Sequence, residues 1–132
     1  MNTLDIPATI RDVCGLRPLE PAHGMILPKN EKEAAQCPDS VVVTSNGQQF
    51  GLYSARAIRT KTHKYVWNLT DTDELYDLTS DPGEKNNLIH APEMAELVAE
   101  LRKKLYEELI AQKDRFAGNE WMKRQLLEGK KL

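Results

Sequence analysis

The sequence predicts an α+β fold, in which a four-stranded antiparallel sheet packs against a long C-terminal helix and a short N-terminal helix precedes the sheet. Two observations carry this prediction. Short β-branched and aromatic segments joined by polar turns fill residues 40–78, and such short connections are typical of antiparallel neighbours. Residues 91–116 then place apolar side chains at helical spacing.

The first expected element is a short helix in "TLDIPATIRDVCG", residues 3–15. Asp5 can cap its start, Pro7 is tolerated in the first turn, and Gly15 supplies a left-handed end. One apolar stripe is formed by Ile6, Ile10 and Val13. This stripe needs an apolar surface to cover it.

A proline-rich connection follows at residues 16–39. Its prolines prevent a regular element, apart from one turn of helix near 31–36. We therefore divide the chain into a segment 1–39, comprising the helix and this connection, and a segment 40–132.

Four strands are expected, at residues 40–45, 52–60, 64–69 and 74–78. Asn46-Gly47 is a turn signal after the first strand, and "KTH" and "TDTD" join the others. The third and fourth strands leave neither face cleanly polar, so we expect both faces of the sheet to be partly covered.

The long helix is expected over 91–116, with Pro92 in its first turn and Gly118 after its end. Its apolar stripe consists of Met94, Leu97, Val98, Leu101, Leu105 and Leu109. Charged residues occupy the opposite side, as on a helix that covers a core. Residues 119–132 are expected to form either a short helix or a frayed end.

Composition excludes several classes of partner. The formal net charge is -2, from 18 basic and 20 acidic residues, which gives no electrostatic footprint for nucleic acid or an anionic membrane. We expect no nucleic-acid or membrane partner. The chain starts without the apolar core of a signal peptide and lacks an apolar run long enough to span a bilayer. These features leave the cellular compartment open.

The most distinctive segment is "DELYDLTSDPGEKNNL", residues 73–88. Pro82 fixes one backbone angle of a turn, and Gly83 can adopt a positive φ there. Asn86 and Asn87 can satisfy backbone groups, and Leu88 can pack beneath the turn.

Together with "ARAIRTKTHKYVWNL", this segment resembles the C-terminal subdomain of sulfatases. The matching residues are Arg56, Arg59, Thr60, Lys64, Tyr65, Glu74 to Leu78, Asp81, Pro82, Glu84, Asn87 and Leu88. "TLDIPATIRDVCGL" also resembles the helix that ends the family's large domain, although "HGMILP" in the connection departs from the family's pattern. The resemblance assigns 1–39 to the end of the large domain and 40–132 to the C-terminal subdomain.

The resemblance implies a sulfuric ester hydrolase whose reactive groups lie outside this region. In sulfatases a C/S-x-P-x-R motif supplies the formylglycine nucleophile, and Asp and Asn side chains hold Ca²⁺ or Mg²⁺. Both precede the matched region, and the surroundings of Cys14, Cys37 and Ser80 do not fit the motif. We expect no catalytic residue, metal ligand or cofactor in this chain, which would contribute structure and part of the substrate cleft without turnover on its own.

Three residues are substrate-binding candidates: Arg59, Lys61 and His63. They lie around the turn between the second and third strands, where cationic side chains can contact a sulfated or acidic ligand. The alternative is an ordinary solvated hairpin. His23 and His90 have no metal-ligand spacing.

Other polar and aromatic features have two interpretations each. Trp67 and Tyr76 can form an aromatic platform for a sugar, or pack in the core. "NLT" at 68–70 is a glycosylation sequon that matters only in a secretory compartment. The Asp71, Asp73 and Glu74 cluster is interpreted as a polar turn with too few ordered ligands for Ca²⁺.

The expected partner is the remainder of a sulfatase large domain. One alternative is a stand-alone interaction module whose N-terminal apolar stripe and partly apolar sheet face bind a partner or a second copy of the chain, as in a dimer. Another is a sulfated-glycan-binding module that uses Trp67, Tyr76 and the cationic hairpin.

Overall fold

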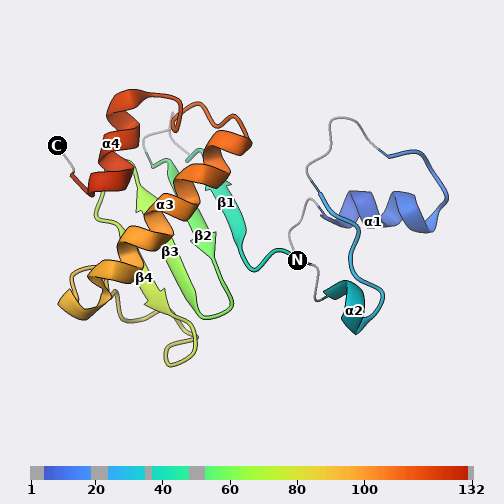
Figure 1. The fold of residues 1–132 in the computed structure, drawn as a ribbon, viewed down its shortest axis with the longest axis horizontal. Coiled ribbons are helices and arrows are strands. Elements are labelled where there is room, and N and C mark those ends of the chain that lie inside the picture. Colours follow the sequence, from blue (N-terminus) through green and yellow to red (C-terminus); the bar gives the residue numbers. More distant parts are fainter. Residues whose placement is uncertain (1–4, 19–23, 35–36, 48–52, 131–132) are drawn as a thin grey trace. The chain divides into compact units, whose positions relative to one another are not determined.

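The computed structural model describes residues 5–18, 24–34, 37–47 and 53–130. It divides into two compact units, residues 1–41 and 42–132, and each is described by itself. The elements (Figure 1) are α1 (Asp5–Val13), α2 (Glu31–Ala34), β1 (Val41–Ser45), β2 (Ala55–Arg59), β3 (His63–Asn68), β4 (Glu74–Asp77), η1 (Pro92–Met94), α3 (Ala95–Ala111) and α4 (Glu120–Glu128).

Helix α1 ends as its sequence predicts. Gly15 adopts a positive φ of 66°. Its N–H donates to the Asp12 carbonyl over 3.1 Å, and the Leu16 N–H donates to the Arg11 carbonyl over 2.9 Å. This pair of bonds is the Schellman motif, which satisfies carbonyls that the helix end leaves open.

An extended segment, residues 24–29, runs beside α1 and is bonded to its side chains. The contacts join Asp5 Oδ1 to Met25 N at 2.9 Å, Thr9 Oγ1 to Leu27 N at 2.8 Å, and Asp12 Oδ2 to Lys29 Nζ at 2.8 Å. Four helical residues advance about 6 Å and two extended residues about 6.6 Å. Contacts can therefore form at regular intervals between α1 and this extended segment.

The sheet has the order β1-β2-β3-β4. Strand β3 pairs antiparallel with both β2 and β4, with Ile58 opposite Tyr65 and Tyr65 opposite Leu75. Because side chains alternate between faces along a strand, these residues and Trp67 share one face. Figure 1 shows α3 crossing that face, with α4 on the same side. The predicted α+β fold is confirmed.

The core lies between this face and the two helices. From α3 it receives Val98, Leu101, Leu105 and Leu109, which are buried as the predicted stripe requires. Each fully buried aliphatic side chain stabilises the fold by about 1.5–3 kcal/mol relative to exposure. Trp67 is 0% exposed, and its Nε1 donates to Gln125 Oε1 of α4 over 3.2 Å. Trp67 is thus a core residue and not a platform for a sugar.

The long helix is shorter than predicted. It ends at Ala111, because Lys113 adopts a positive φ of 56° and Asp114 Oδ1 accepts from the Phe116 N–H over 2.9 Å. Residues after Asn119 form α4. Of the two outcomes predicted for residues 119–132, a short helix or a frayed end, the short helix is correct. No helix in the described ranges is long and apolar enough to cross a bilayer.

Candidate functional site

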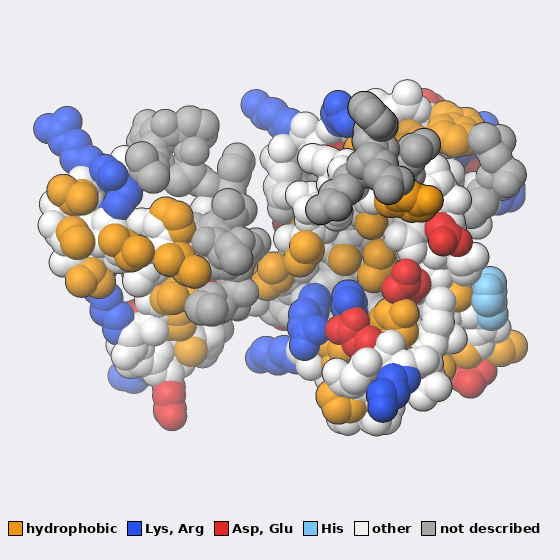
Figure 2. Space-filling model, turned by 180° about the vertical axis from the view of Figure 1, so that it is seen from behind, with side chains coloured by type: hydrophobic (Ala, Val, Ile, Leu, Met, Phe, Trp, Pro, Cys, Tyr) orange, Lys and Arg blue, Asp and Glu red, His pale blue; other side chains and the backbone are white. Residues whose placement is uncertain are grey.

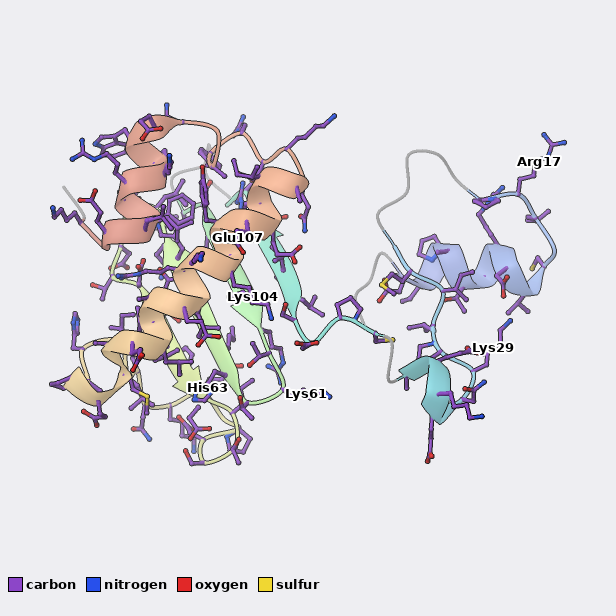
Figure 3. The ribbon with its side chains drawn as sticks, viewed as in Figure 1. Arg17, Lys29, Lys61, His63, Lys104 and Glu107 are labelled. Atoms are coloured by element: carbon purple, nitrogen blue, oxygen red, sulfur yellow. The ribbon has the colours of Figure 1, made fainter. Side chains whose placement is uncertain are left out.

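The hairpin between β2 and β3 has a tightly bonded turn. The Thr60 N–H donates to the His63 carbonyl over 2.8 Å, and the His63 N–H donates to Thr60 Oγ1 over 2.9 Å. The Thr60 hydroxyl also donates to the His63 carbonyl over 3.1 Å. Figure 3 shows Lys61 and His63 at this end of the sheet. The turn therefore holds the predicted cationic residues on an ordered backbone.

The three predicted binding residues do not converge on one point. Arg59 lies opposite Lys64 in the register, and His63 lies opposite Asp77. Because β3 alternates, His63 shares the face of buried Tyr65, whereas Lys64 and Arg59 lie on the other face. Lys61 is exposed at the tip. The alternation of side chains along the strands explains why these residues are separated. Whether Arg59, Lys61 and His63 bind a substrate stays a prediction.

The face of the sheet opposite α3, called the open face below, carries a shared ion pair at this end. Glu84 Oε1 lies 3.5 Å from Arg59 Nη1, and Glu84 Oε2 contacts Lys64 Nζ. Lys64 Nζ also lies 5.8 Å from the centre of the Tyr76 ring. Neither Glu84 nor Lys64 was predicted as a binding residue, although both match the family motif.

A second polar cluster continues along the open face. The Tyr76 hydroxyl donates to Glu74 Oε2 over 2.9 Å, and Asn68 Nδ2 donates to Glu74 Oε1 over 2.9 Å. Asn68 Nδ2 also donates to the Thr72 carbonyl over 2.8 Å. The amide of the "NLT" sequon is therefore engaged within the fold. Figure 2 shows positive, negative and apolar side chains side by side on this surface of the sheet unit.

The predicted "SDPGE" turn is present, with the Glu84 N–H donating to the Asp81 carbonyl over 3.1 Å. Asp81 Oδ2 accepts from the backbone N–H groups of Lys85 and Asn86, over 2.7 and 2.8 Å. The positive φ, 53°, belongs to Glu84 and not to Gly83. Carboxylate bonds to the backbone of the turn outweigh the cost of a non-glycine residue in this conformation. Glu84 is thereby placed over the end of the open face.

Asn87 fastens this turn to the edge of the sheet, as the sequence predicts. Its Oδ1 accepts from the backbone N–H groups of Leu75 and Ile89, each over 3.0 Å. Its Nδ2 donates to the Asp73 carbonyl over 3.1 Å. One side chain thus satisfies three backbone groups.

Asp73 belongs to a buried triad beneath α3. It is 3% exposed, and its Oδ2 accepts from the Tyr65 hydroxyl over 2.7 Å and from Arg102 Nη2 over 3.2 Å. Arg102 Nε donates to the Tyr65 hydroxyl over 3.1 Å. Burial, reinforced by the charge of Asp73, raises the pKa of Tyr65 far above its ordinary value. This carboxylate therefore anchors the helix to the sheet.

A metal site would need several ligand side chains close together among the described residues. No group of three or more His, Cys, Asp and Glu side chains in these residues is placed to hold a metal ion. In the acidic cluster, Asp73 is paired with Arg102, and Asp71 Oδ1 accepts from the Thr72 N–H over 2.6 Å. Both oxygens of Asp73 and Oδ1 of Asp71 accept hydrogen bonds within the protein.

Arg56 is buried and bonded to several other residues, and these contacts were not predicted from the sequence. It is 2% exposed, and its Nε donates to Asp114 Oδ2 over 2.9 Å. Its Nη1 donates to the Ser45 carbonyl and its Nη2 to Asn46 Oδ1, over 3.0 and 3.1 Å. Its guanidinium also lies 4.8 Å from the centre of the Phe116 ring. The residue joins the end of β1 to the loop between the helices.

The rejected nucleophile positions have ordinary surroundings. The Ser80 hydroxyl donates to Asp77 Oδ2 over 2.8 Å, and this bond lowers the pKa of Asp77. Cys14 is an exposed free thiol, and Cys37 is a half-buried one.

The two histidines that were not assigned to the site remain without a predicted role. His23 lies outside the described residues, and His90 is exposed.

The other notable surface is the apolar stripe of α1. Ile6, Ile10 and Val13 are 42%, 56% and 73% exposed, and no residue of α1 is buried. Figure 2 shows apolar side chains gathered on the surface of this unit. Within the described residues, no side chain of this stripe is buried by other parts of the chain.

Comparison with known proteins gives a consistent result. The family model described as "N-sulphoglucosamine sulphohydrolase, C-terminal" matches residues 1–112. A Δ4,5-hexuronate-2-O-sulfatase of Bacteroides thetaiotaomicron is 31% identical over an alignment of 116 residues that covers 85% of this chain and 24% of that protein. An uncharacterised protein of Haemophilus influenzae is 35% identical over 66 residues, which are 50% of this chain and 32% of that protein.

Solved structures agree on the fold. The structure of a 2-O GAG sulfatase superimposes with a TM-score of 0.74 at 27% identity, covering 89% of this chain and 26% of that one. A second, in complex with its substrate D-glucosamine-2-N,6-O-disulfate, gives 0.72 at 24% identity, covering 88% and 25%. The chain thus spans about a quarter of the length of these relatives. It belongs to the N-sulphoglucosamine sulphohydrolase C-terminal family and is a C-terminal sulfatase domain.

Proposed function

We propose that this chain forms one wall of the substrate cleft of a sulfuric ester hydrolase and does not turn over substrate alone. The sequence contains no C/S-x-P-x-R motif, and in sulfatases that motif supplies the nucleophile. Two of the motif residues that the chain shares with the family, Asp81 and Asn87, bond to backbone groups in and beside the "SDPGE" turn. Their role is architectural.

The exposed stripe of α1 is the single observation that supports this function most. A helix with a continuous apolar stripe and no buried residue gains little from folding by itself. Covering Ile6, Ile10 and Val13 would remove apolar surface from water at about 25 cal/mol per Å². We assign this cover to the remainder of a sulfatase large domain.

The substrate contacts in this proposal come from Arg59, Lys61 and His63. Lys61 is exposed at the hairpin tip, and Arg59 is 55% exposed with one side-chain partner in the described residues, Glu84. Guanidinium and ammonium groups bind sulfate oxygens through charge-assisted hydrogen bonds. The curated relative named above acts on a 2-O-sulfated hexuronate, and we propose a sulfated sugar as the substrate class.

A chimera tests the proposal. Replacing the C-terminal quarter of the Bacteroides sulfatase with this chain should retain hydrolysis of that enzyme's substrate. Ile10→Asp in the chimera should abolish soluble, active protein, because it places a charge in the covered stripe. Arg17→Gln changes net charge by the same amount at an exposed site and should leave activity intact. An active Ile10→Asp chimera would contradict the assigned cover.

Self-association is the second candidate, and the same exposed stripe favours it. Two copies can cover each other's α1 in a symmetric dimer. Sedimentation at micromolar concentration decides: a dimer that Ile10→Asp converts to a monomer supports this candidate, and a wild-type monomer excludes it.

A further inference from the structure

Glu84 lies at the end of the open face that carries Arg59 and Lys64. Its carboxylate contacts Arg59 and Lys64, so one anion serves two cations. Lys61 is exposed at the adjoining turn. Two cationic side chains therefore share the Glu84 carboxylate at this end.

The two contacts of Glu84 differ in strength. Lys64 is 28% exposed and is held closely, with its ammonium also over the Tyr76 ring. Arg59 is 55% exposed and touches Glu84 through one nitrogen at 3.5 Å. A guanidinium bound well to a carboxylate makes two parallel, shorter bonds. Arg59 is thus the loosely held partner, and an exposed pair of this kind contributes little stability.

The backbone keeps the Glu84 carboxylate in this place. Residue 84 has a φ of 53°, and Asp81 fixes the following backbone N–H groups of Lys85 and Asn86. A glutamate held in a conformation that favours glycine indicates that surrounding bonds determine its position.

We propose that Glu84 is an internal counter-ion that competes with the sulfate group of a sulfated sugar for Arg59. When the ligand binds, Arg59 leaves Glu84 and makes paired bonds to sulfate oxygens, while Lys64 stays with Glu84. The ligand class rests on the proposed function above, whereas the exchange of partners rests on the contacts of Glu84. Glu84 thus sets how tightly this end of the sheet binds an anion.

Titration of the ¹⁵N-labelled chain with N-acetylglucosamine 6-sulfate, followed through the Arg59 Nε–Hε resonance, tests the proposal. Glu84→Gln should tighten binding about twofold to fivefold, since it removes the competing charge. Glu100→Gln, an equal change of net charge on the exposed side of α3, should leave the affinity near that of the wild type. Arg59→Gln in the Glu84→Gln background should remove the gain.

Other results would overturn it. Equal affinities for Glu84→Gln and Glu100→Gln would show that the gain in affinity comes from net charge alone. If no variant binds the sugar, the proposed site is wrong. If Glu84→Gln does not fold, Glu84→Gly can replace it in the titration, because glycine adopts the positive φ without strain.

Two further ligands test the ligand class. Unsulfated N-acetylglucosamine should not bind, and inorganic sulfate should bind more weakly than the sugar ester. The opposite results would reject a sulfated sugar as the ligand. The chimera test above can fail independently of this one.

Discussion

Arg56 and Asp114 are 58 residues apart in the sequence, yet Arg56 Nε donates to Asp114 Oδ2 over 2.9 Å inside the sheet unit. The side chains of both residues are largely shielded from water, at 2% and 12% exposure. This pair joins β2 to the loop between α3 and α4. The C-terminal helix α4 thus depends on a residue of the sheet for its position.

Replacing Arg56 with lysine should destabilise the sheet unit by about 2–3 kcal/mol. Lysine keeps the charge but lacks the planar fork that reaches Asp114, Ser45 and Asn46 together. Urea unfolding followed by tryptophan fluorescence measures the loss. The matched change Arg59→Lys, at an exposed position, should cost less than about 0.5 kcal/mol. Equal costs would show that the Arg56 contacts are not specific.

Tyr65→Phe should destabilise the chain by about 1–3 kcal/mol at neutral pH, because buried Asp73 and Arg102 lose a hydrogen-bond partner. Tyr53→Phe is the control, since Tyr53 is 67% exposed, and should change the free energy of unfolding little. A similar loss in both variants would contradict the triad.

The same triad predicts a loss of stability at alkaline pH. The folded-state pKa of Tyr65 is raised, so the unfolded state releases this proton first, from its ordinary pKa of about 10. The contribution is complete below pH 10 and falls by about 1.4 kcal/mol per pH unit above it. Urea unfolding between pH 8 and about pH 11 should show this slope in the wild type and a shallower one in Tyr65→Phe. Identical slopes would count against the raised pKa.

Asn87→Ala should cost about 2–3 kcal/mol, since it leaves backbone groups of Leu75, Ile89 and Asp73 without their partner. Asn86→Ala is the natural comparison. Both side chains are exposed, but that of Asn86 makes no hydrogen bond to the described residues, so its loss should be nearly neutral. Thermal unfolding of the two variants in parallel distinguishes them, and equal melting temperatures would refute the role of Asn87.

Gly47→Ala should destabilise the fold by about 2 kcal/mol, whereas Gly83→Ala should be nearly neutral. Gly47 has a φ of 62°, and an added Cβ would lie 2.9 Å from the Tyr53 backbone. At Gly83 a Cβ would meet the flexible Lys85 side chain at 3.4 Å. Chemical denaturation compares the pair, and a larger loss at Gly83 would contradict the turn geometry described above.

Local periodicity was sufficient to predict the framework of this fold. The stripe through Leu101, Leu105 and Leu109 is buried, and the turn signal at Gly47 has its positive φ. These features depend on neighbours within a few residues, which the sequence displays directly.

Features that depend on distant partners were not predicted. The end of α3 is set by Asp114, whose partner Arg56 lies on another element, so the helical pattern to Phe116 was misleading. The positive φ at Glu84 is an exception, because the bonds from Asp81 that accompany it are local. For the candidate site, strand alternation separates Arg59 from His63 and could have been applied to the sequence alone. The pairing of Arg59 with Glu84 could not.

The central claim is that the reactive groups of the sulfatase lie outside this chain. The most direct test is to incubate the purified chain with an aryl sulfate in the presence of Ca²⁺ or Mg²⁺ and to measure released phenol. We predict a rate equal to that of the heat-denatured chain. Release above that background, repeated with independently purified protein, would contradict the claim.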